Sequence, residues 1–161
     1  MVHGRHVRFG EKRGRLIGPT KRGKGTKIMA ICDGGSLPVA VTIHSASPSE
    51  MKLAEGTFGS RLVPSLPRVM VADRGYDSNG VRSFFADRGV EPVIPARRNN
   101  RKATHQDGRN LRRYKKRWKV ERLNAWLQND RRIVTRYERK PENFLGFIEL
   151  SCMKILLRRC F

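Results

Sequence analysis

Tyr114, Arg117 and Glu121 combine an aromatic ring, a cation and a carboxylate at a spacing that could serve metal and phosphate binding. Offsets of three and four residues place them on one face of a helix, and Gln128 continues this polar stripe beyond Glu121. Glu121 is also the only acid within residues 108–129, in the most basic part of the chain. Such a carboxylate is either an ion-pair partner of Arg117 or a metal ligand beside phosphate-binding cations.

Asp73 is the second acid whose position suits metal binding. It ends an apolar run, residues 68–73, that predicts a buried strand. Ligands bind just beyond the carboxyl ends of the strands in open α/β sheets, and Mg²⁺ prefers carboxylate and phosphate oxygens. The other interpretation is that Asp73 caps the loop that follows, as Asp often does. Its position alone leaves both roles open.

Four further polar residues have simpler interpretations. Asp33 precedes a glycine, a pair that is typical of hairpin turns. Asp77 is expected to support the loop that follows Asp73. His44 and His105 have no partner at metal-ligand spacing. We therefore predict structural roles for these residues.

The elements that must position these residues follow from hydrophobic periodicity and turn residues. Residues 27–32 and 38–44 predict a hairpin of two strands, and apolar runs that alternate with helical patterns follow it. This order predicts an α/β fold with a mixed sheet flanked by helices. The remaining expected elements are a basic Gly-rich arm at 1–25, a helix at about 47–58, strands at 68–73 and 93–94, a helix that begins at 78, a basic loop at 96–112, and helices at about 113–129 and 142–159.

The charge of the chain favours a polyanionic partner. Its 161 residues include 35 Lys and Arg against 14 Asp and Glu, a net charge of +21. Nucleic acid is the expected partner of such a field. An anionic membrane surface is the other candidate, but Glu149 and Lys154 interrupt the longest apolar stretch, so no membrane span is predicted. The cations expected to contact DNA phosphates, together with Arg117, are Arg97, Arg98, Arg101, Lys102, Arg112, Arg113, Lys115 and Lys116.

The aromatic residues of the basic helix could add contacts to bases. Tyr114 and Trp118 are candidates for stacking on bases or ribose. Core packing is the alternative for Trp118, and it is favoured for Trp126, which lies at helical spacing from Leu123.

The three cysteines, Cys32, Cys152 and Cys160, are scattered without metal-ligand spacing. This usage is typical of a reduced, cytoplasmic protein. No apolar run follows the basic N-terminus, so no signal peptide is predicted.

Four stretches together resemble a known family: TKRGKGTKIMAICDGGSLPVAVTIHSASPSE, VMVADRGYDS, RRYKKRWKVERLNAWLQNDRR and ENFLGFIEL. They are similar to the C-terminal part of bacterial insertion-sequence transposases with an RNase H-like DDE catalytic domain. The family signature Y-x2-R-x3-E-x6-K matches Tyr114, Arg117 and Glu121, but its last position is Gln128 instead of Lys. The resemblance covers nearly the whole chain from Thr20.

The resemblance implies that Asp73 is the second acid of the catalytic triad and Glu121 the third, and that both bind Mg²⁺ or Mn²⁺. It implies that water nicks donor DNA and that a 3′ hydroxyl is then joined to target DNA. The partners would be the transposon terminal inverted repeats and target DNA, with a homodimer in the DNA complex. Gln128 would alter a DNA contact without affecting the metal ligands, and Tyr114 and Arg117 would position DNA.

The first acid of this family lies on the first strand, before the basic Gly-rich segment. No Asp precedes Asp33, which falls in the predicted turn. We therefore expect residues 1–161 to be the C-terminal part of the catalytic domain, with the first strand incomplete or missing. Loss of one metal ligand would make the chain weakly active or inactive alone, and unpaired strand edges would make it marginally stable. We also expect the carboxylates of Asp73 and Glu121 to face each other across a common cleft.

Two functions other than catalysis also fit a strongly basic chain. A nucleic-acid-binding remnant would keep the basic surface after loss of the first acid. A basic RNA-binding protein of the ribosomal type would also account for the charge. It would not account for the polar stripe or for a buried strand that ends at Asp73.

Overall fold

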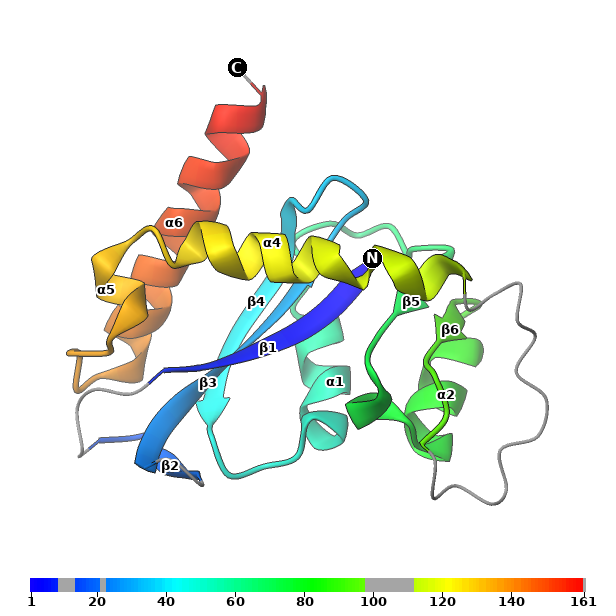
Figure 1. Ribbon diagram of the computed structural model, residues 1–161, viewed down its shortest axis with the longest axis horizontal. Coiled ribbons are helices and arrows are strands. Elements are labelled where there is room, and N and C mark those ends of the chain that lie inside the picture. The colour runs from blue at the N-terminus through cyan, green and yellow to red at the C-terminus, as the bar shows by residue number, and fades with distance from the viewer. Residues whose placement is uncertain (9–13, 21–22, 98–111, 161) are drawn as a thin grey trace.

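The computed structural model describes residues 1–8, 14–20, 23–97 and 112–160, whose strands form one six-stranded sheet (Figure 1). The strand order is β2-β3-β1-β5-β6, and β4 pairs with β3 outside this path. The strands are β1 (Val2–Arg8), β2 (Gly18–Thr20), β3 (Gly23–Cys32), β4 (Pro38–Ser45), β5 (Val69–Val71) and β6 (Glu91–Val93). The helices are α1 (Glu50–Gly59), α2 (Asn79–Ala86), α4 (Trp118–Leu127), α5 (Arg131–Val134) and α6 (Pro141–Cys160), with 3₁₀ turns η1 (Arg74–Tyr76) and η2 (Lys115–Arg117).

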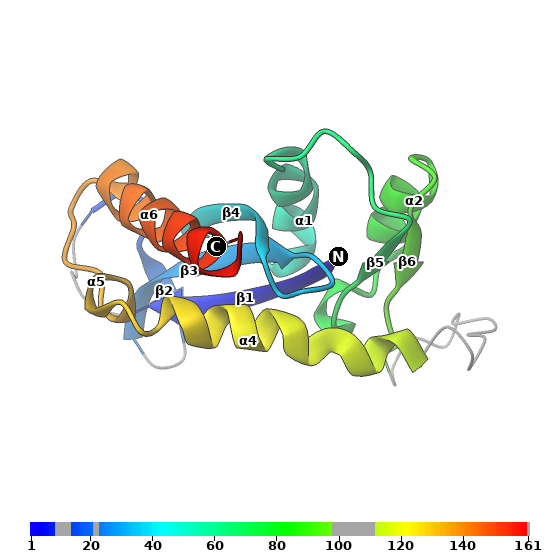
Figure 2. The same cartoon turned by 90° about the horizontal axis from the view of Figure 1, so that it is seen from above.

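Helices cover both faces of this sheet. Because successive strand residues point to opposite faces, Ile28 and Cys32 of β3 lie in one apolar cluster with residues of α4, α5 and α6. Met29 and Ile31 lie in a second cluster with residues of α1 and α2. Figure 2 shows α4 and α1 on opposite sides of the strands. Coverage on both faces explains why β3 is buried without interruption from Gly25 to Cys32.

The mixed sheet predicted from the sequence is confirmed. β3 is antiparallel to β1, β2 and β4, whereas β5 is parallel to both β1 and β6. The hairpin of β3 and β4 turns at Asp33, whose Oδ1 accepts hydrogen bonds from the backbone N–H groups of Gly35 (2.7 Å) and Leu37 (2.8 Å). The structural role predicted for Asp33 is therefore confirmed.

The N-terminal segment contains two strands where the sequence predicted a basic Gly-rich arm. Val2–Arg8 form β1, which pairs with β3 from Val2–Cys32 to Arg8–Thr26 and with β5 at Val2–Val71. Residues 18–20 form β2, and residues 9–13 and 21–22 lie outside the described residues. The sequence VHGRHVR lacks a clear apolar alternation, so its strand conformation depends on hydrogen bonds to distant neighbours. With β1 between β3 and β5, the open sheet edge expected there does not exist.

The helices agree with the predicted order but differ at their ends. The helix predicted at 113–129 is a helical turn at 112–114, then η2, then α4, which ends at Leu127. The short α5 was not predicted. The predicted basic loop is described only at its ends, because residues 98–111 lie outside the described residues. In the described ranges, none of the helices combines the length and the apolar character that crossing a membrane requires.

Candidate active site

Asp73 lies two residues beyond the end of β5 and caps the turn η1. Its backbone is extended, with φ −78° and ψ 174°, and its Oδ1 accepts a hydrogen bond of 2.7 Å from the N–H of Gly75. The capping interpretation is therefore confirmed. This bond occupies one carboxylate oxygen, and Oδ2 accepts no hydrogen bond from the described residues. Capping fixes the carboxylate without excluding a second role for it.

Asp77 holds the loop after Asp73 in place, as predicted. Its side chain is only 2% exposed, and its Oδ1 accepts two hydrogen bonds from the guanidinium of Arg82. Its Oδ2 accepts a bond of 2.8 Å from the backbone N–H of Arg97. The guanidinium of Arg97 donates to the carbonyl oxygens of Arg74 (2.9 Å) and Gly75 (2.8 Å). Arg97 thus braces the loop, and its predicted contact to DNA stays a prediction.

Glu50 is a neighbour of Asp73 that the sequence did not reveal. A Cβ atom placed on Gly75 would lie 2.7 Å from Asp73 Oδ1 and 3.8 Å from Glu50 Oε2, so the two carboxylates lie close to this glycine. Lys27, 2% exposed, donates a bond of 3.0 Å to Glu50 Oε1 and another to the carbonyl of Pro48. The buried ammonium of Lys27 thus offsets the negative charge of Glu50.

Three residues of the predicted polar stripe, Tyr114, Arg117 and Glu121, lie together. Arg117 Nη2 lies 2.7 Å from Glu121 Oε1, and the guanidinium carbon of Arg117 lies 5.9 Å from the centre of the Tyr114 ring. The side chains of Arg117 and Glu121 are 40% and 56% exposed. The ion-pair interpretation of Glu121 is therefore realised, at an exposed site where such a pair contributes only ~0.3–0.5 kcal/mol. Gln128 is exposed at the C-cap of α4.

The strand that precedes Asp73 and the helix that carries Glu121 contribute to one apolar cluster. Val71, two residues before Asp73, packs in the same apolar cluster as Val120, which precedes Glu121. Lys119 Nζ donates a hydrogen bond to the carbonyl of Gly34, so the start of α4 lies against the turn after β3. No described interaction joins the two carboxylates, and their facing arrangement across a cleft stays a prediction.

The donor set fits a divalent cation in chemistry but supplies few ligands. Asp73 and Glu121 offer the carboxylate oxygens that Mg²⁺ and Mn²⁺ prefer, with substrate phosphate completing such sites. Among the described residues, no group of three or more His, Cys, Asp or Glu side chains could hold a metal ion. The central strand β1 has the sequence VHGRHVR and carries no acid. At most two protein carboxylates of the predicted triad are therefore accounted for.

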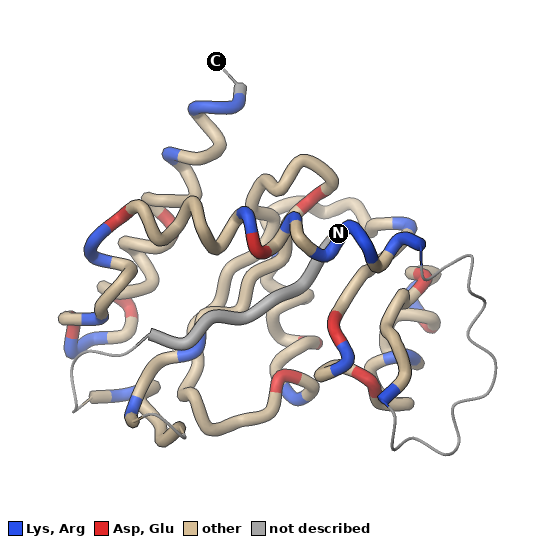
Figure 3. The backbone as a smooth tube through the Cα atoms, viewed as in Figure 1, with Lys and Arg blue, Asp and Glu red and all other residues tan. Residues whose placement is uncertain are grey.

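Cations surround the segment that leads into α4. Figure 3 shows Lys and Arg along residues 112–119, on α5 and at the C-terminal end of α6. Arg112, Lys115 and Lys116 are exposed, while Arg113 Nη1 lies 2.7 Å from Glu91 Oε2 at a partly exposed site. The predicted phosphate contacts of Arg98, Arg101 and Lys102, and the structural role of His105, fall outside the described residues.

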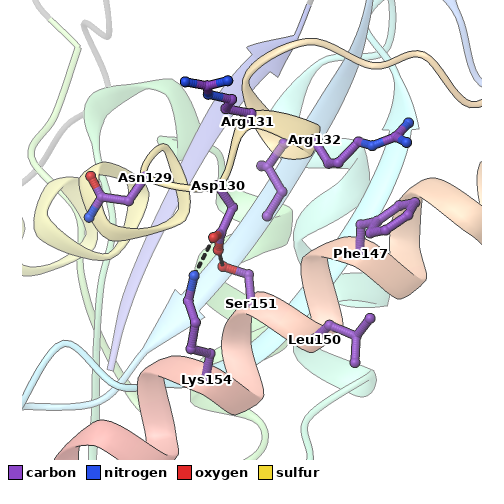
Figure 4. Close-up of a pocket in the computed structure, with 9 residues that line it drawn as sticks. Asn129, Asp130, Arg131, Arg132, Phe147, Leu150, Ser151 and Lys154 are labelled. Atoms are coloured by element: carbon purple, nitrogen blue, oxygen red, sulfur yellow. Dashed lines mark hydrogen bonds and ion pairs between the residues drawn. The ribbon is translucent and has the colours of Figure 1, made fainter.

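A cavity of about 320 Å³ lies between α5 and α6, and it contains neither Asp73 nor Glu121. Figure 4 shows Lys154 and Ser151 of α6 pointing toward Asp130, whose carboxylate accepts a hydrogen bond from each. These bonds, that of Lys154 first, lower the pKa of Asp130 below its ordinary value. Figure 1 places α5 at the opposite end of the molecule from β5 and β6. The cavity is therefore separate from the candidate active site.

Comparison with known proteins gives two related sequences and a family. Residues 4–157 match the family described as Transposase DDE domain. The chain is 35% identical over 148 residues to a putative transposase for insertion sequence element IS402 from Burkholderia cepacia, covering 85% of this chain and 65% of that protein. It is 30% identical over 145 residues to a putative transposase for insertion sequence element IS6501 from Brucella ovis, covering 83% and 98%. The chain thus spans just under two thirds of the length of the IS402 protein.

The fold also resembles a solved structure. The cryo-EM structure of the piggyBac transposase synaptic complex with hairpin DNA superposes with a TM-score of 0.61 over 94% of this chain and 45% of that chain. The sequence identity is 13%, so this likeness concerns the fold alone. The mixed sheet with helices on both faces is RNase H-like, as the sequence predicted.

Proposed function

The chain belongs to the family described as Transposase DDE domain, and from this membership we propose that it cleaves DNA at the ends of an insertion sequence and joins it to target DNA. One observation supports this proposal most. The strand that leads to Asp73 and the helix that carries Glu121 pack into a single apolar cluster. This packing holds β5 and α4 together, and the resemblance predicts the second and third catalytic acids at Asp73, just beyond β5, and at Glu121, on α4.

The proposed metal ligands are Asp73 and Glu121. A bound Mg²⁺ or Mn²⁺ lowers the pKa of an attacking water and stabilises the leaving oxygen of a phosphodiester. Asp73 is suited to this role because its Oδ1 is held by the N–H of Gly75, which fixes the carboxylate and leaves Oδ2 for a cation. Glu121 is suited because its carboxylate is 56% exposed on α4.

Arg117 would change partners when DNA binds. Its exposed ion pair with Glu121 contributes only ~0.3–0.5 kcal/mol, whereas a guanidinium binds phosphate through two parallel hydrogen bonds of greater strength. When Arg117 binds a DNA phosphate, its ion pair with Glu121 Oε1 would break. In this scheme DNA binding itself uncovers the carboxylate that the reaction needs.

The remaining cations would hold the DNA backbone. Arg112, Lys115 and Lys116 are exposed on the segment before α4, and each phosphate that they neutralise releases counterions. Such contacts position DNA but carry no sequence information. A homodimer in the DNA complex stays a prediction, to be tested by sedimentation of the protein with end DNA.

A second candidate function is DNA binding without catalysis. It is favoured by the absence of any acid from β1 and by the lack of a three-ligand group among the described residues. The basic surface around α4 would remain useful to such a protein because phosphate contacts do not depend on a metal.

Nicking of plasmid DNA that carries the element's ends separates the two candidates. Wild type is compared, in Mn²⁺ and in EDTA, with Asp73→Asn, Glu121→Gln and Asp87→Asn. Asp87 is an exposed residue at the C-cap of α2 and controls for the loss of one carboxylate. We expect Mn²⁺-dependent nicking by wild type and Asp87→Asn, and a loss of roughly 100-fold or more in the other two.

The same assay also has an outcome that contradicts catalysis. If wild type in Mn²⁺ nicks no faster than Asp73→Asn and Glu121→Gln, the catalytic proposal is wrong for this chain. Retention of DNA by all of the proteins in a mobility-shift assay would then establish the binding function.

A further inference from the structure

Four planar side chains alternate along one edge of α4 and α6. Trp118, Arg122 and Trp126 recur every four residues on α4, so they share a face of that helix. The guanidinium carbon of Arg122 lies 4.1 Å from the ring centre of Trp118 and 5.7 Å from that of Trp126. Arg159 of α6 lies 4.8 Å from the ring centre of Trp126. We name this set, Trp118, Arg122, Trp126 and Arg159, the indole–guanidinium ladder.

The outer end of the ladder is open to solvent. Trp118 is 45% exposed and belongs to neither apolar core cluster, whereas Trp126 is partly buried against the core of α4 and α6. The core role predicted for Trp126 is therefore confirmed, and Trp118 is left for another role. A cavity of about 200 Å³ adjoins the inner end of the ladder, lined by Trp126, Asn129, Lys154, Ile155, Arg158 and Arg159. Most of its polar lining is cationic, which suits a phosphate beside a stacked base.

Flat side chains of this kind bind unpaired bases. Every base has a π-face that stacks on an indole, and stacked Arg adds a cation–π contribution. In a duplex these faces are covered by neighbouring bases, so an exposed indole such as Trp118 gains little from paired DNA. Phosphate contacts, by contrast, are available on both kinds of DNA. The ladder would therefore distinguish single-stranded from double-stranded DNA and would not read the base sequence.

We propose that the indole–guanidinium ladder binds single-stranded DNA, with Trp118 as its main stacking residue. The proposal rests on the proposed function and deepens it, because Trp118 lies three residues before Glu121 and Arg122 follows Glu121 directly. A strand stacked on Trp118 runs within one helical turn of the carboxylate proposed to act on DNA. The ladder thus holds the unpaired strand at a cleavage site, and Arg122 and Arg159 bind its backbone.

The test compares two DNA probes in EDTA, where no nicking occurs. One is a labelled oligothymidylate, and the other is the same strand annealed to oligoadenylate. Binding is measured for wild type, Trp118→Ala, Trp118→Phe and a double variant Lys115→Gln/Lys116→Gln. The double variant is the matched control, because it removes exposed cations from the adjoining segment without touching the ladder. Circular dichroism checks that each variant is folded.

We expect Trp118→Ala to weaken binding of the single strand by roughly 5- to 150-fold, which corresponds to ~1–3 kcal/mol for one stacked base. Its affinity for the duplex should change little, and Trp118→Phe should recover much of the loss. The double lysine variant should weaken both probes to a similar extent. Equal losses for both probes in Trp118→Ala, or no loss for either, would overturn the proposal.

A spectroscopic measurement checks the same contact without truncating Trp118. In Trp126→Phe, Trp118 is the only indole, and stacking on a base should quench its fluorescence when oligothymidylate binds. If oligothymidylate binds without quenching the fluorescence of Trp118, the proposed stacking on Trp118 is wrong. These binding measurements need no metal, so their outcome is independent of the nicking assay. Preference for the single strand without nicking would reject only the catalytic proposal. Nicking without such a preference would reject only the proposed role of the ladder.

Discussion

The carboxylate of Asp73 accepts a 2.7 Å hydrogen bond from the backbone N–H of Gly75, at the point where the buried strand β5 gives way to the turn η1. The same glycine leaves room for that carboxylate, since a Cβ atom at position 75 would lie 2.7 Å from Asp73 Oδ1. One residue without a side chain therefore holds a proposed metal ligand in place and makes space for it.

Gly75→Ala is expected to displace the Asp73 carboxylate and to weaken Mn²⁺ binding. A misplacement of about 1 Å can cost ~100-fold in rate, so nicking should fall to a similar extent while DNA affinity is kept. Electron paramagnetic resonance measures Mn²⁺ affinity without needing an active enzyme. Gly80→Ala is the matched control, because a Cβ there meets nothing within 4 Å and should stabilise α2 by up to ~1 kcal/mol. Unchanged Mn²⁺ affinity in Gly75→Ala would exclude Asp73 as a ligand in this position.

Arg117→Gln is expected to lower DNA affinity with little effect on folding. Its ion pair with Glu121 is exposed, so the free energy of unfolding should change by less than ~0.5 kcal/mol. If Arg117 binds one phosphate, the slope of log affinity against log salt should decrease by about one. Salt titrations of binding provide the measurement. Lys52→Gln, an exposed change on α1 across the sheet, should leave the slope nearly unaltered; an equal change in both variants would indicate only a general charge effect.

Asp130 should make stability depend on acid pH. Hydrogen bonds from Lys154 and then Ser151 lower the pKa of Asp130 in the folded state. Its stabilising contribution is therefore complete above the ordinary Asp pKa, about 3.9, and is lost as pH falls through the lower folded pKa. Urea unfolding should show that wild type exceeds Asp130→Asn at pH 7 and that the difference shrinks in acid. A difference that stays constant across this range would contradict the assignment, and Asp87→Asn provides an exposed carboxylate for comparison.

Substitution of Arg136 is expected to lower the free energy of unfolding more than substitution of an exposed cation. It is 1% exposed and donates to Thr26 Oγ1 (2.5 Å) and to the carbonyls of Arg15 (3.1 Å), Glu138 (2.9 Å) and Arg139 (3.1 Å). Arg136→Met removes this donor from the buried Thr26 hydroxyl and from three partly buried carbonyls, which should cost about 3 kcal/mol. Chemical denaturation measures this loss. Arg131→Met, an exposed change on α5, should cost less than ~0.5 kcal/mol, and similar values for the two would refute the buried network.

Much of the candidate site could be predicted because its signals are local. The polar stripe of Tyr114, Arg117 and Glu121 follows from helical periodicity alone, and the strand before Asp73 follows from its apolar run. The turn at Asp33 follows from the adjoining glycine. In each case, residues close in sequence are also close in space, so spacing is sufficient to place them.

The contacts that were missed join residues that lie far apart in the chain. β1 was not predicted, because its own sequence has no clear strand pattern and its hydrogen bonds come from β3 and β5. Glu50 approaches Asp73 only where the start of α1 meets the turn after β5. Arg136 is buried by partners more than a hundred residues away as well as by near neighbours.

The sequence by itself determined the charge, the order of elements and the residue types that could hold a metal and bind phosphate. Only the tertiary structure decided which of them share an environment. It placed Val71 of β5 and Val120 of α4 in one cluster, and it brought Arg159 of α6 onto Trp126 of α4. The physical reason is that spacing specifies the face of a helix or strand, whereas the partner of that face is selected by packing of distant apolar surfaces.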